Sequence, residues 1–373
     1  MPNFARKFFR DFLGLKPGRP SSPAIATPSV PSTNTNLVIN QDERSLSEDK
    51  FNGTYPRLTR LHDGAILAVF TWRGPEQLRV LKISKSTDNG QTFMDFAEII
   101  RGQGEIDNPF AIEVAPNHIL AAFRNHDFGG EFGFTHFRIT VYESRDGGQT
   151  WAYLSQAAEK SPPLGIWEPF MRHGLDGGLQ LIYSHEFAPD DQRTMQVISY
   201  DRGKTWSSPR CIEGAADRFR DGMTGIAETM DTAENRPALV LVFETTRYGP
   251  HFNLEAVISY DDGYTWSHRH EIYVPPPGHN AGAPQIASLG DGSLVVVFMT
   301  DDQAEEVKWI HNAAIKVVHG SPPHGGRINW TMPAVVSPAS SFWPGIMALD
   351  SQRALVTYEH GGPRARSVTW KPN

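Results

Sequence analysis

Residues 144–151 read Ser-Arg-Asp-Gly-Gly-Gln-Thr-Trp, and the pattern Ser-x-Asp-x-Gly-x-Thr-Trp/Phe occurs three more times in the chain. The four copies begin at Ser86, Ser144, Ser199 and Ser259, so they are 58, 55 and 60 residues apart. A repeat at such an even spacing indicates a propeller or another array of similar units.

The chemistry of the repeat is that of a hairpin turn. Its Asp can accept backbone N–H groups, and its Gly supplies a positive φ that a Cβ would oppose. An apolar run precedes each copy, as at residues 254–258, and the aromatic residue at the end buries a large area. We therefore assign a structural role to the four aspartates, which are Asp88, Asp146, Asp201 and Asp261.

A second pattern occurs six times. Each copy has a short entry, usually containing proline, then a turn, then an apolar strand that ends in polar residues. The six copies span residues 55–72, 108–124, 167–184, 222–244, 283–298 and 343–358. Together with the four turn repeats they predict an all-β, six-bladed β-propeller over residues 37–373. A degenerate fifth turn repeat is expected near residues 325–330.

Composition narrows the function. The chain has 373 residues, a formal charge of −7 and one cysteine, Cys211, which disfavours nucleic-acid binding and intrachain disulfides. No apolar run approaches the roughly 20 residues that span a bilayer. Residues 1–15 are basic and amphipathic without a secretory apolar stretch, and residues 16–36 are rich in Pro, Ser and Thr. We expect a disordered tail and linker over residues 1–36 and a monomer. The lack of a secretory stretch favours an intracellular location, and the sequence leaves the compartment open.

Two carboxylates stand out as candidates for chemistry. In a propeller the start of each first strand and the end of each second strand converge on one face. Glu168 lies in the aromatic entry Trp-Glu-Pro-Phe, and Glu244 ends an apolar strand. Two converging acids are the minimum machinery for glycoside hydrolysis. The alternative is that each glutamate only accepts hydrogen bonds from a turn. Tyr358 ends the sixth apolar strand, where it is either a catalytic phenol or a core residue.

The same geometry selects candidates for substrate binding. They are Arg57, Trp72, Asn108, Arg124, His126, Asp127, Trp167, His185 and Glu186. Arg57 has a surface ion pair as its alternative role, and the tryptophans have packing between blades. The histidines show no metal-ligand spacing, and no phosphate loop or dinucleotide motif is present. We therefore expect no metal and no cofactor.

The turn repeat resembles the Asp-box (BNR repeat) of the sialidase-type β-propellers, which implies that the boxes lie on the outer rim. Sialidases have an Arg-Ile-Pro entry, an Asp soon after the first blade that serves as the acid, and three arginines that bind the carboxylate of the substrate. Here the entry is Pro56-Arg57-Leu58, and residues 73–80 contain no Asp. The chain more closely resembles glycoside hydrolase family 93, the exo-1,5-α-L-arabinanases, which are typically secreted. That resemblance implies catalysis by two glutamates on neighbouring blades with a supporting tyrosine, matching Glu168, Glu244 and Tyr358.

These observations predict a retaining exo-glycosidase that acts on α-1,5-linked arabinan or arabino-oligosaccharides. Glu168, in apolar surroundings, should have a raised pKa and act as general acid/base. Glu244, beside Thr245, Thr246 and Arg247, should stay ionised and act as nucleophile, although the reverse assignment is open. We expect their carboxyl groups about 5–5.5 Å apart, with Tyr358 within hydrogen-bond reach of one. The alternatives are a sialidase or related exo-glycosidase, and a non-catalytic propeller that binds glycans or proteins.

Overall fold

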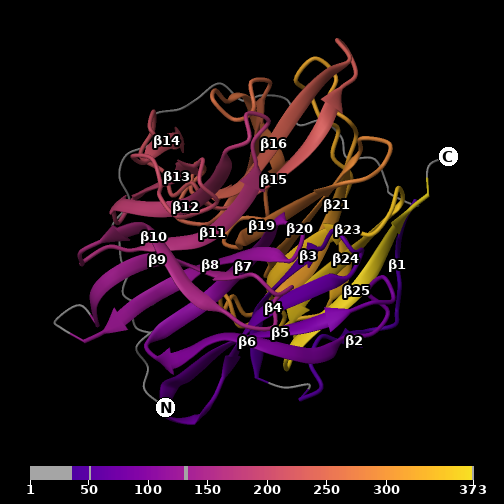
Figure 1. The fold of residues 1–373 in the computed structure, drawn as a ribbon. Helices are drawn as coiled ribbons and strands as arrows, with labels where there is room; N and C mark the ends of the chain where they lie inside the picture. Colours follow the sequence, from indigo (N-terminus) through magenta and orange to yellow (C-terminus); the bar gives the residue numbers. More distant parts are fainter. Residues whose placement is uncertain (1–35, 50–51, 130–132, 372–373) are drawn as a thin grey trace.

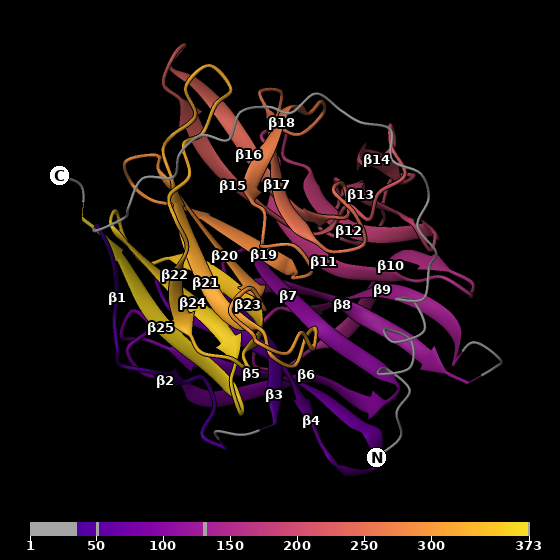
Figure 2. The same ribbon diagram turned by 180° about the vertical axis from the view of Figure 1, so that it is seen from behind.

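The computed structural model describes residues 36–49, 52–129 and 133–371, and these form six antiparallel sheets arranged around a centre (Figures 1 and 2). The predicted six-bladed all-β propeller is confirmed. The predicted tail at residues 1–36 lies almost wholly outside the described residues.

Blades 1 to 5 each consist of four consecutive strands, named here from first to fourth in chain order. Blade 1 has β3 (Gly53–Arg60), β4 (Ile66–Arg73), β5 (Leu78–Ser86) and β6 (Met94–Gln103), with a short 3₁₀ helix η2 (Pro75–Gln77). Blade 2 has β7 (Glu105–Ala115), β8 (His118–Phe128), β9 (Phe134–Ser144) and β10 (Ala152–Lys160). Blade 3 has β11 (Ile166–His173), β12 (Leu179–Ala188), β13 (Asp191–Ser199) and β14 (Arg210–Glu213). Blade 4 has β15 (Gly222–Asp231), β16 (Arg236–Thr245), β17 (Asn253–Ser259) and β18 (Ser267–Tyr273). Blade 5 has β19 (Ala281–Ser288), β20 (Leu294–Thr300), β21 (Ala314–Gly320) and β22 (Ala334–Ser337).

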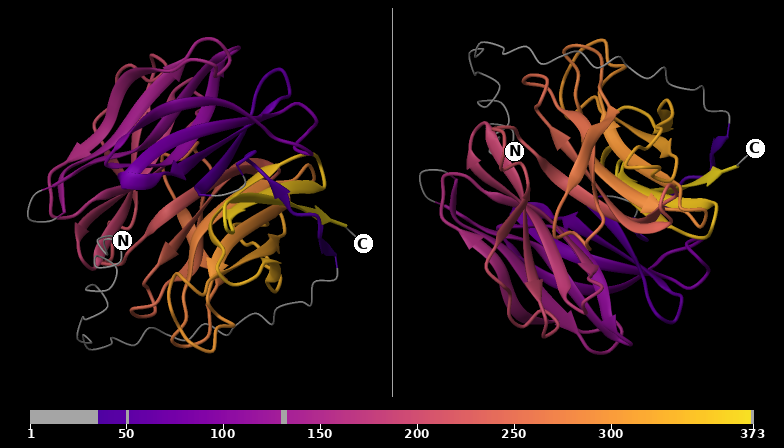
Figure 3. Two further views of the ribbon diagram at one scale, coloured as in Figure 1. Left: turned by 90° about the horizontal axis from the view of Figure 1, so that it is seen from below. Right: turned by 90° about the horizontal axis from the view of Figure 1, so that it is seen from above.

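Blade 6 joins the two ends of the described chain. It has β23 (Phe342–Ala348), β24 (Arg353–Glu359) and β25 (Pro363–Trp370), and β1 (Leu37–Ile39) pairs with β25 as its fourth strand. The two-residue β2 (Arg44–Ser45) extends the pairing along β25. Figure 3 shows the yellow strands of blade 6 beside the indigo segment at which the described residues begin. The first strand of blade 6 also contacts the first strand of blade 1, so the ring is closed.

The core lies between the blades. The second strands β4, β16 and β20 are buried along nearly their whole length, which explains their continuous apolar sequence. Clusters of buried apolar side chains fill the spaces between neighbouring blades, for example between blades 1 and 2 and between blades 4 and 5. This packing fixes the blades relative to one another and leaves the first strands to line the centre.

The four turn repeats lie where the sequence predicts, between the third and fourth strands of blades 1 to 4. In the second copy Asp146 Oδ1 accepts the N–H of Thr150 at 2.9 Å, and Oδ2 accepts its hydroxyl at 2.6 Å. The N–H of Gly148, at φ +93°, donates to Ser144 Oγ at 2.8 Å. The other three aspartates accept equivalent Thr hydroxyl bonds at 2.6 Å, so all four close turns.

The degenerate copy in blade 5 uses a carboxylate from its neighbour. Gly325 and Gly326 lie between β21 and β22, and their N–H groups both donate to Asp231 of blade 4 at 2.9 Å. The aspartate that the local sequence lacks is therefore replaced across the blade interface.

Candidate active site

The first strand of every blade carries the same β-bulge. Each has one extra residue relative to the second strand, and the residue at the bulge has a positive φ between 44° and 54°. These residues are Tyr55, Asn108, Glu168, Met223, Ala283 and Trp343. A left-handed conformation costs a residue with a side chain about 1–3 kcal/mol, and its sixfold recurrence marks a built feature that re-aims side chains at one end of the centre.

The second strands contribute a matching ring of side chains opposite the bulges. The equivalent positions are Thr71, Arg124, Ser184, Glu244, Met299 and Glu359. At three of them the side chain accepts the bulge N–H of the next blade: Asn108 to Thr71 at 3.2 Å, Met223 to Ser184 at 3.0 Å, and Ala283 to Glu244 at 2.7 Å. Glu168 is thus a bulge residue of blade 3, and Glu244 is the matching second-strand residue of blade 4.

The side chain of Glu168 is mostly shielded from solvent. Only 13% of its side chain is exposed, and Oε1 lies 3.9 Å from Arg124 Nη1. Burial raises the pKa of Glu168 to about 8 against the opposing charge of Arg124, and the carboxylates of Glu244 and Glu186 add to the rise. At neutral pH this carboxyl is therefore mostly protonated, as the sequence predicts for a general acid.

Glu244 is buried on the other side of the blade interface. Burial raises its pKa to about 7, while the Ala283 N–H and the charge of Arg220 limit the rise. A Cβ on Gly282 would lie 2.5 Å from Glu244 Oε2 and 3.1 Å from the Trp309 ring, so glycine is needed for this close approach. The sequence prediction that Thr245, Thr246 and Arg247 keep Glu244 ionised is corrected: Arg247 lies 3.5 Å from Glu255, and burial dominates at Glu244.

Arg124 is the positive centre of the site. Its guanidinium lies 3.4 Å from Glu105 and 3.5 Å from Asp107, besides its contact with Glu168. It also sits 5.2 Å from the Tyr55 ring and 5.4 Å from the Trp167 ring. Three carboxyl groups therefore surround Arg124, and one of them, Asp107, also lies 3.9 Å from Arg73.

Several further predicted residues lie around this centre. Arg57 donates to the backbone oxygen of Pro344 at 2.8 Å, and burial lowers its pKa to about 10. Asn108 is buried at a bulge, and Trp167 borders Arg124. His126 is buried behind Trp167, with its ring 5.2 Å away, so it supports that side chain. Glu186 accepts the Gly165 N–H at 2.9 Å and Arg220 at 2.7 Å.

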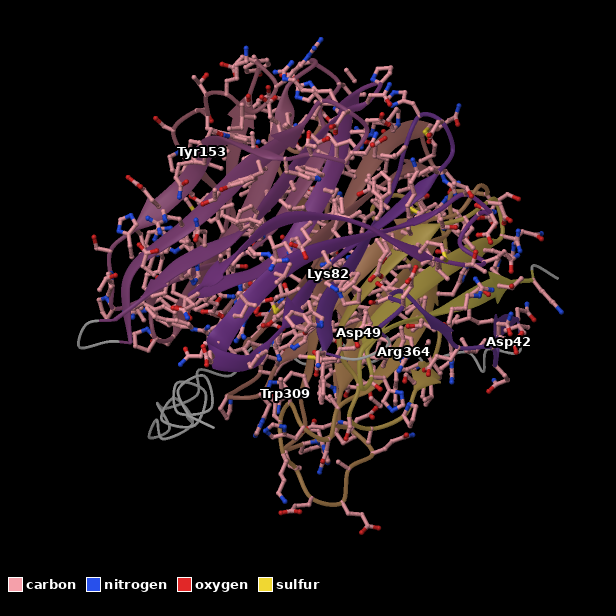
Figure 4. All side chains as sticks on the ribbon, turned by 60° about the horizontal axis from the view of Figure 1, so that its bottom comes forward. Asp42, Asp49, Lys82, Tyr153, Trp309 and Arg364 are labelled. Atoms are coloured by element: carbon pink, nitrogen blue, oxygen red, sulfur yellow. The ribbon has the colours of Figure 1, made fainter. Side chains whose placement is uncertain are left out.

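Three predicted binding residues point elsewhere. The Trp72 indole donates to Asp49 at 2.8 Å and lies under Lys82, and Figure 4 shows Asp49 and Lys82 close together. Asp127 pairs with Arg138, and His185 stacks on Phe187 at 4.3 Å. Each follows the second-strand residue of its blade that faces the centre by one or three residues. Because successive side chains of a strand point to opposite faces, these three point away from the centre.

Tyr358 also requires correction. Its hydroxyl donates to Glu43 at 2.8 Å, and its ring is fully buried in the core between blades 5 and 6. The next residue, Glu359, is the one equivalent to Glu244 in the ring. The sequence prediction placed Tyr358 beside the catalytic pair; the alternation of side chains turns it to the other face, and we leave it out of the proposed machinery.

Several residues of the site were not predicted from the sequence. Tyr55 and Trp343 are bulge residues whose rings stack at 4.6 Å, and Trp309 borders Glu244. Asp107 and Glu359 add two more carboxyl groups; burial raises the pKa of Glu359. Tyr55, Asn108, Glu168, Ala283 and Trp343 all precede a proline, so superimposing the entries on that proline identifies the bulge positions.

In the described part of the chain, no group of three or more His, Cys, Asp or Glu side chains is arranged to hold a metal ion. The same residues include no helix long and apolar enough to cross a bilayer.

The fold defines a sialidase-like six-bladed propeller. No family model matches the chain, and no curated protein sequence does either. Among solved structures, it is similar to a family 93 α-L-arabinofuranosidase of Fusarium graminearum with arabinobiose (TM-score 0.63, 19% identity, 88% of this chain and 96% of that one). It is also similar to an α-L-arabinanase of Penicillium chrysogenum with arabinobiose (0.59, 16%, 88% and 97%). A Hadza microbial sialidase shares the fold (0.54, 15%, 85% and 65%). At these identities the likeness establishes the shared propeller.

Proposed function

We propose that the protein is a retaining exo-glycosidase that acts on α-1,5-linked arabinan or arabino-oligosaccharides. The observation that carries the proposal is the pair Glu168, whose side chain is 13% exposed, and Glu244, which is buried, on neighbouring blades at the same end of the ring. Two such acids are what glycoside hydrolysis requires. The arabinan specificity rests on the resemblance of the chain and on the fold shared with an α-L-arabinofuranosidase and an α-L-arabinanase.

The environments favour distinct roles for the two groups. Glu168, whose pKa is raised by burial and by the neighbouring carboxylates, is the proton donor, and Glu244 is the nucleophile. The Ala283 N–H and the charge of Arg220 both favour the ionised form of Glu244. At pH 7 to 8 the productive combination, with one group protonated and the other ionised, is well populated.

The reaction then proceeds in two displacements. Glu244 attacks the anomeric carbon and forms an ester while the glycosidic bond breaks, and Glu168 gives its proton to the departing oxygen. Ionised Glu168 next takes a proton from water, and the water oxygen attacks the anomeric carbon and releases Glu244 as a carboxylate. Each step inverts the anomeric centre, so the net outcome is retention.

Charge at the site favours a neutral sugar over sialic acid. Recognition of a substrate carboxylate needs an arginine whose donors are available. Arg124 already faces three carboxyl groups, and Arg57 donates to backbone oxygens. Arg73 lies 3.9 Å from Asp107. A sialoside would add a second negative charge beside the Asp107 carboxylate and is expected to bind poorly.

Aromatic side chains offer a surface for the sugar ring. Trp309 lies on the segment between β20 and β21, and its indole edge approaches the same point over Gly282 as the Glu244 carboxylate. Sugar rings present C–H faces that pack on aromatic rings. We assign to Trp309 the stacking of the sugar that reacts with Glu244.

The deciding experiment is an activity screen of the purified protein on linear α-1,5-arabinan, an aryl α-L-arabinofuranoside and an aryl sialoside. We expect release of arabinose units from the first two and at most trace turnover of the third. Turnover of the sialoside alone would establish the alternative exo-glycosidase. Absence of turnover together with measurable glycan binding would establish a binding propeller.

A further inference from the structure

Arg220 and the buried Glu186 link the entries of blades 3 and 4. Glu186, on β12, is only 4% exposed and uses both carboxylate oxygens: Oε2 accepts the Gly165 N–H at 2.9 Å, and Oε1 accepts Arg220 Nη2 at 2.7 Å. Gly165 immediately precedes β11, which carries Glu168. Glu186 therefore holds the segment that positions the proposed acid.

Arg220 is anchored from several directions beside the proposed nucleophile. Nη2 also donates to Gln192 Oε1 at 2.9 Å, and Nη1 donates to the Pro189 oxygen at 3.0 Å. Its backbone N–H donates to Thr246 Oγ1 at 3.0 Å, two residues beyond Glu244. Gly222, two residues after Arg220, pairs with Glu244 across the sheet. These bonds fix a positive charge that acts on Glu244.

We propose that Glu186 and Arg220 are positioning residues that form a charge bridge between the two proposed catalytic glutamates and set the pH range in which the pair is correctly protonated. The inference rests on the proposed function and deepens it, because it assigns the separation of the two roles to residues that do not touch the reacting bond.

The charged groups around the pair determine the direction of each effect. Glu244 is faced by Arg220 before β15, by the Ala283 N–H on β19 and by Glu168 on β11. Glu168 is faced by Arg124 on β8, Arg57 on β3, Glu244 on β16, Glu186 on β12 and the phenol of Tyr55 on β3. The positive charge of Lys160, on β10, lies near enough to Glu186 to interact with it.

Removing each partner of the bridge should move the pH profile in opposite directions. Arg220→Gln removes a positive charge from Glu244, so the acid limb of kcat/KM should move up by about 0.5–1 pH unit. Glu186→Gln removes a negative charge from Glu168 and leaves Arg220 uncompensated, so both limbs should move down by a similar amount. A purely structural role would lower kcat in both variants without opposite shifts.

The experiment is the pH dependence of kcat/KM on an unactivated aryl arabinofuranoside, whose leaving group needs the proton of Glu168, for the full chain and both variants. Arg218→Gln is the matched control, because Arg218 lies in the same segment but pairs with exposed Asp190 at 2.7 Å; its limbs should stay where they are in the unsubstituted protein. Arg220→Lys keeps the charge and should restore the acid limb.

Unmoved limbs in Glu186→Gln, or shifts of the same sign in both variants, would overturn the bridge. If Arg220→Gln does not fold, Glu186→Gln decides alone, because glutamine keeps the shape of the side chain. If the unsubstituted protein turns over no arabinoside, the proposed function fails, and carbon-13 NMR titration of the Glu168 and Glu244 carboxyl groups in the same variants still tests the bridge.

Discussion

Replacing Glu168 by Gln should stabilise the protein at high pH and not at low pH. Burial raises the pKa of this carboxyl from 4.5 to about 8 in the folded chain. Because the folded pKa is the higher one, the contribution of the neutral carboxyl to stability is complete below about pH 4.5 and is lost as the pH rises to about 8. Glutamine keeps the shape and cannot ionise.

The magnitude follows from the size of that shift. Each pKa unit corresponds to about 1.4 kcal/mol, so the ionisation penalty that the substitution removes is larger at pH 8.5 than at pH 5 by about 4 kcal/mol. For a domain of this size that corresponds to a rise in Tm of about 5 °C at pH 8.5 relative to the change at pH 5.

The assay is thermal unfolding followed by circular dichroism at both pH values. Glu105→Gln is the comparison of opposite sign: despite its burial, Arg124 and His126 lower the pKa of Glu105 to about 2, so its loss should destabilise the protein at pH 8.5. If Glu168→Gln shifts Tm equally at both pH values, Glu168 is not a buried group of raised pKa, and its role as general acid loses its basis.

Three further predictions follow from the site. The kcat/KM profile on an unactivated aryl arabinofuranoside should be bell-shaped with limbs near pH 7 and pH 8, set by the coupled glutamate pair; a plateau across this range would contradict the two raised pKa values. Tyr358→Phe should cost about 1–2 kcal/mol of stability, measured by urea unfolding, because Glu43 loses the hydrogen bond from the phenol, while kcat at 25 °C should stay near the unsubstituted value; a large loss of kcat would return this tyrosine to the active site. Trp309→Ala should raise KM for arabino-oligosaccharides about tenfold, whereas Ile310→Ala, which loosens the same segment, should change it little; equal effects would show that Trp309 only anchors the segment.

The fold could be predicted because its signals are local. The turn at Asp146 is specified by residues within four positions of it, and each apolar second strand is followed by such signals. The hydrogen bonds from Gly325 and Gly326 of blade 5 to Asp231 join residues 94 and 95 positions apart, so no local sequence pattern predicts them. The pairing of β1 with β25 is likewise a contact between the two ends of the described chain.

The site could be predicted only to the level of strand ends. Glu168 and Glu244 were found because an acid at a strand end in apolar surroundings needs an explanation. Tyr358 was misplaced because an offset of one residue turns a side chain to the other face of a strand, and Glu359 holds the ring position. Tyr55 was missed because the bulge that aims it toward Arg124 is a backbone feature that no hydrophobic pattern expresses.

The central claim is that Glu244 is the nucleophile of a retaining arabinosidase, and chemical rescue tests it most directly. Glu244→Ala should have no measurable turnover of an activated aryl α-L-arabinofuranoside, and added azide should restore part of it by forming the arabinosyl azide of inverted configuration, identified by proton NMR. Glu168→Ala should keep the first displacement with the same substrate, whose leaving group needs no proton, and should be slowed only in the second, which loses the base that activates water. Full activity of Glu244→Ala without azide, or a rescued product of retained configuration, would contradict the account.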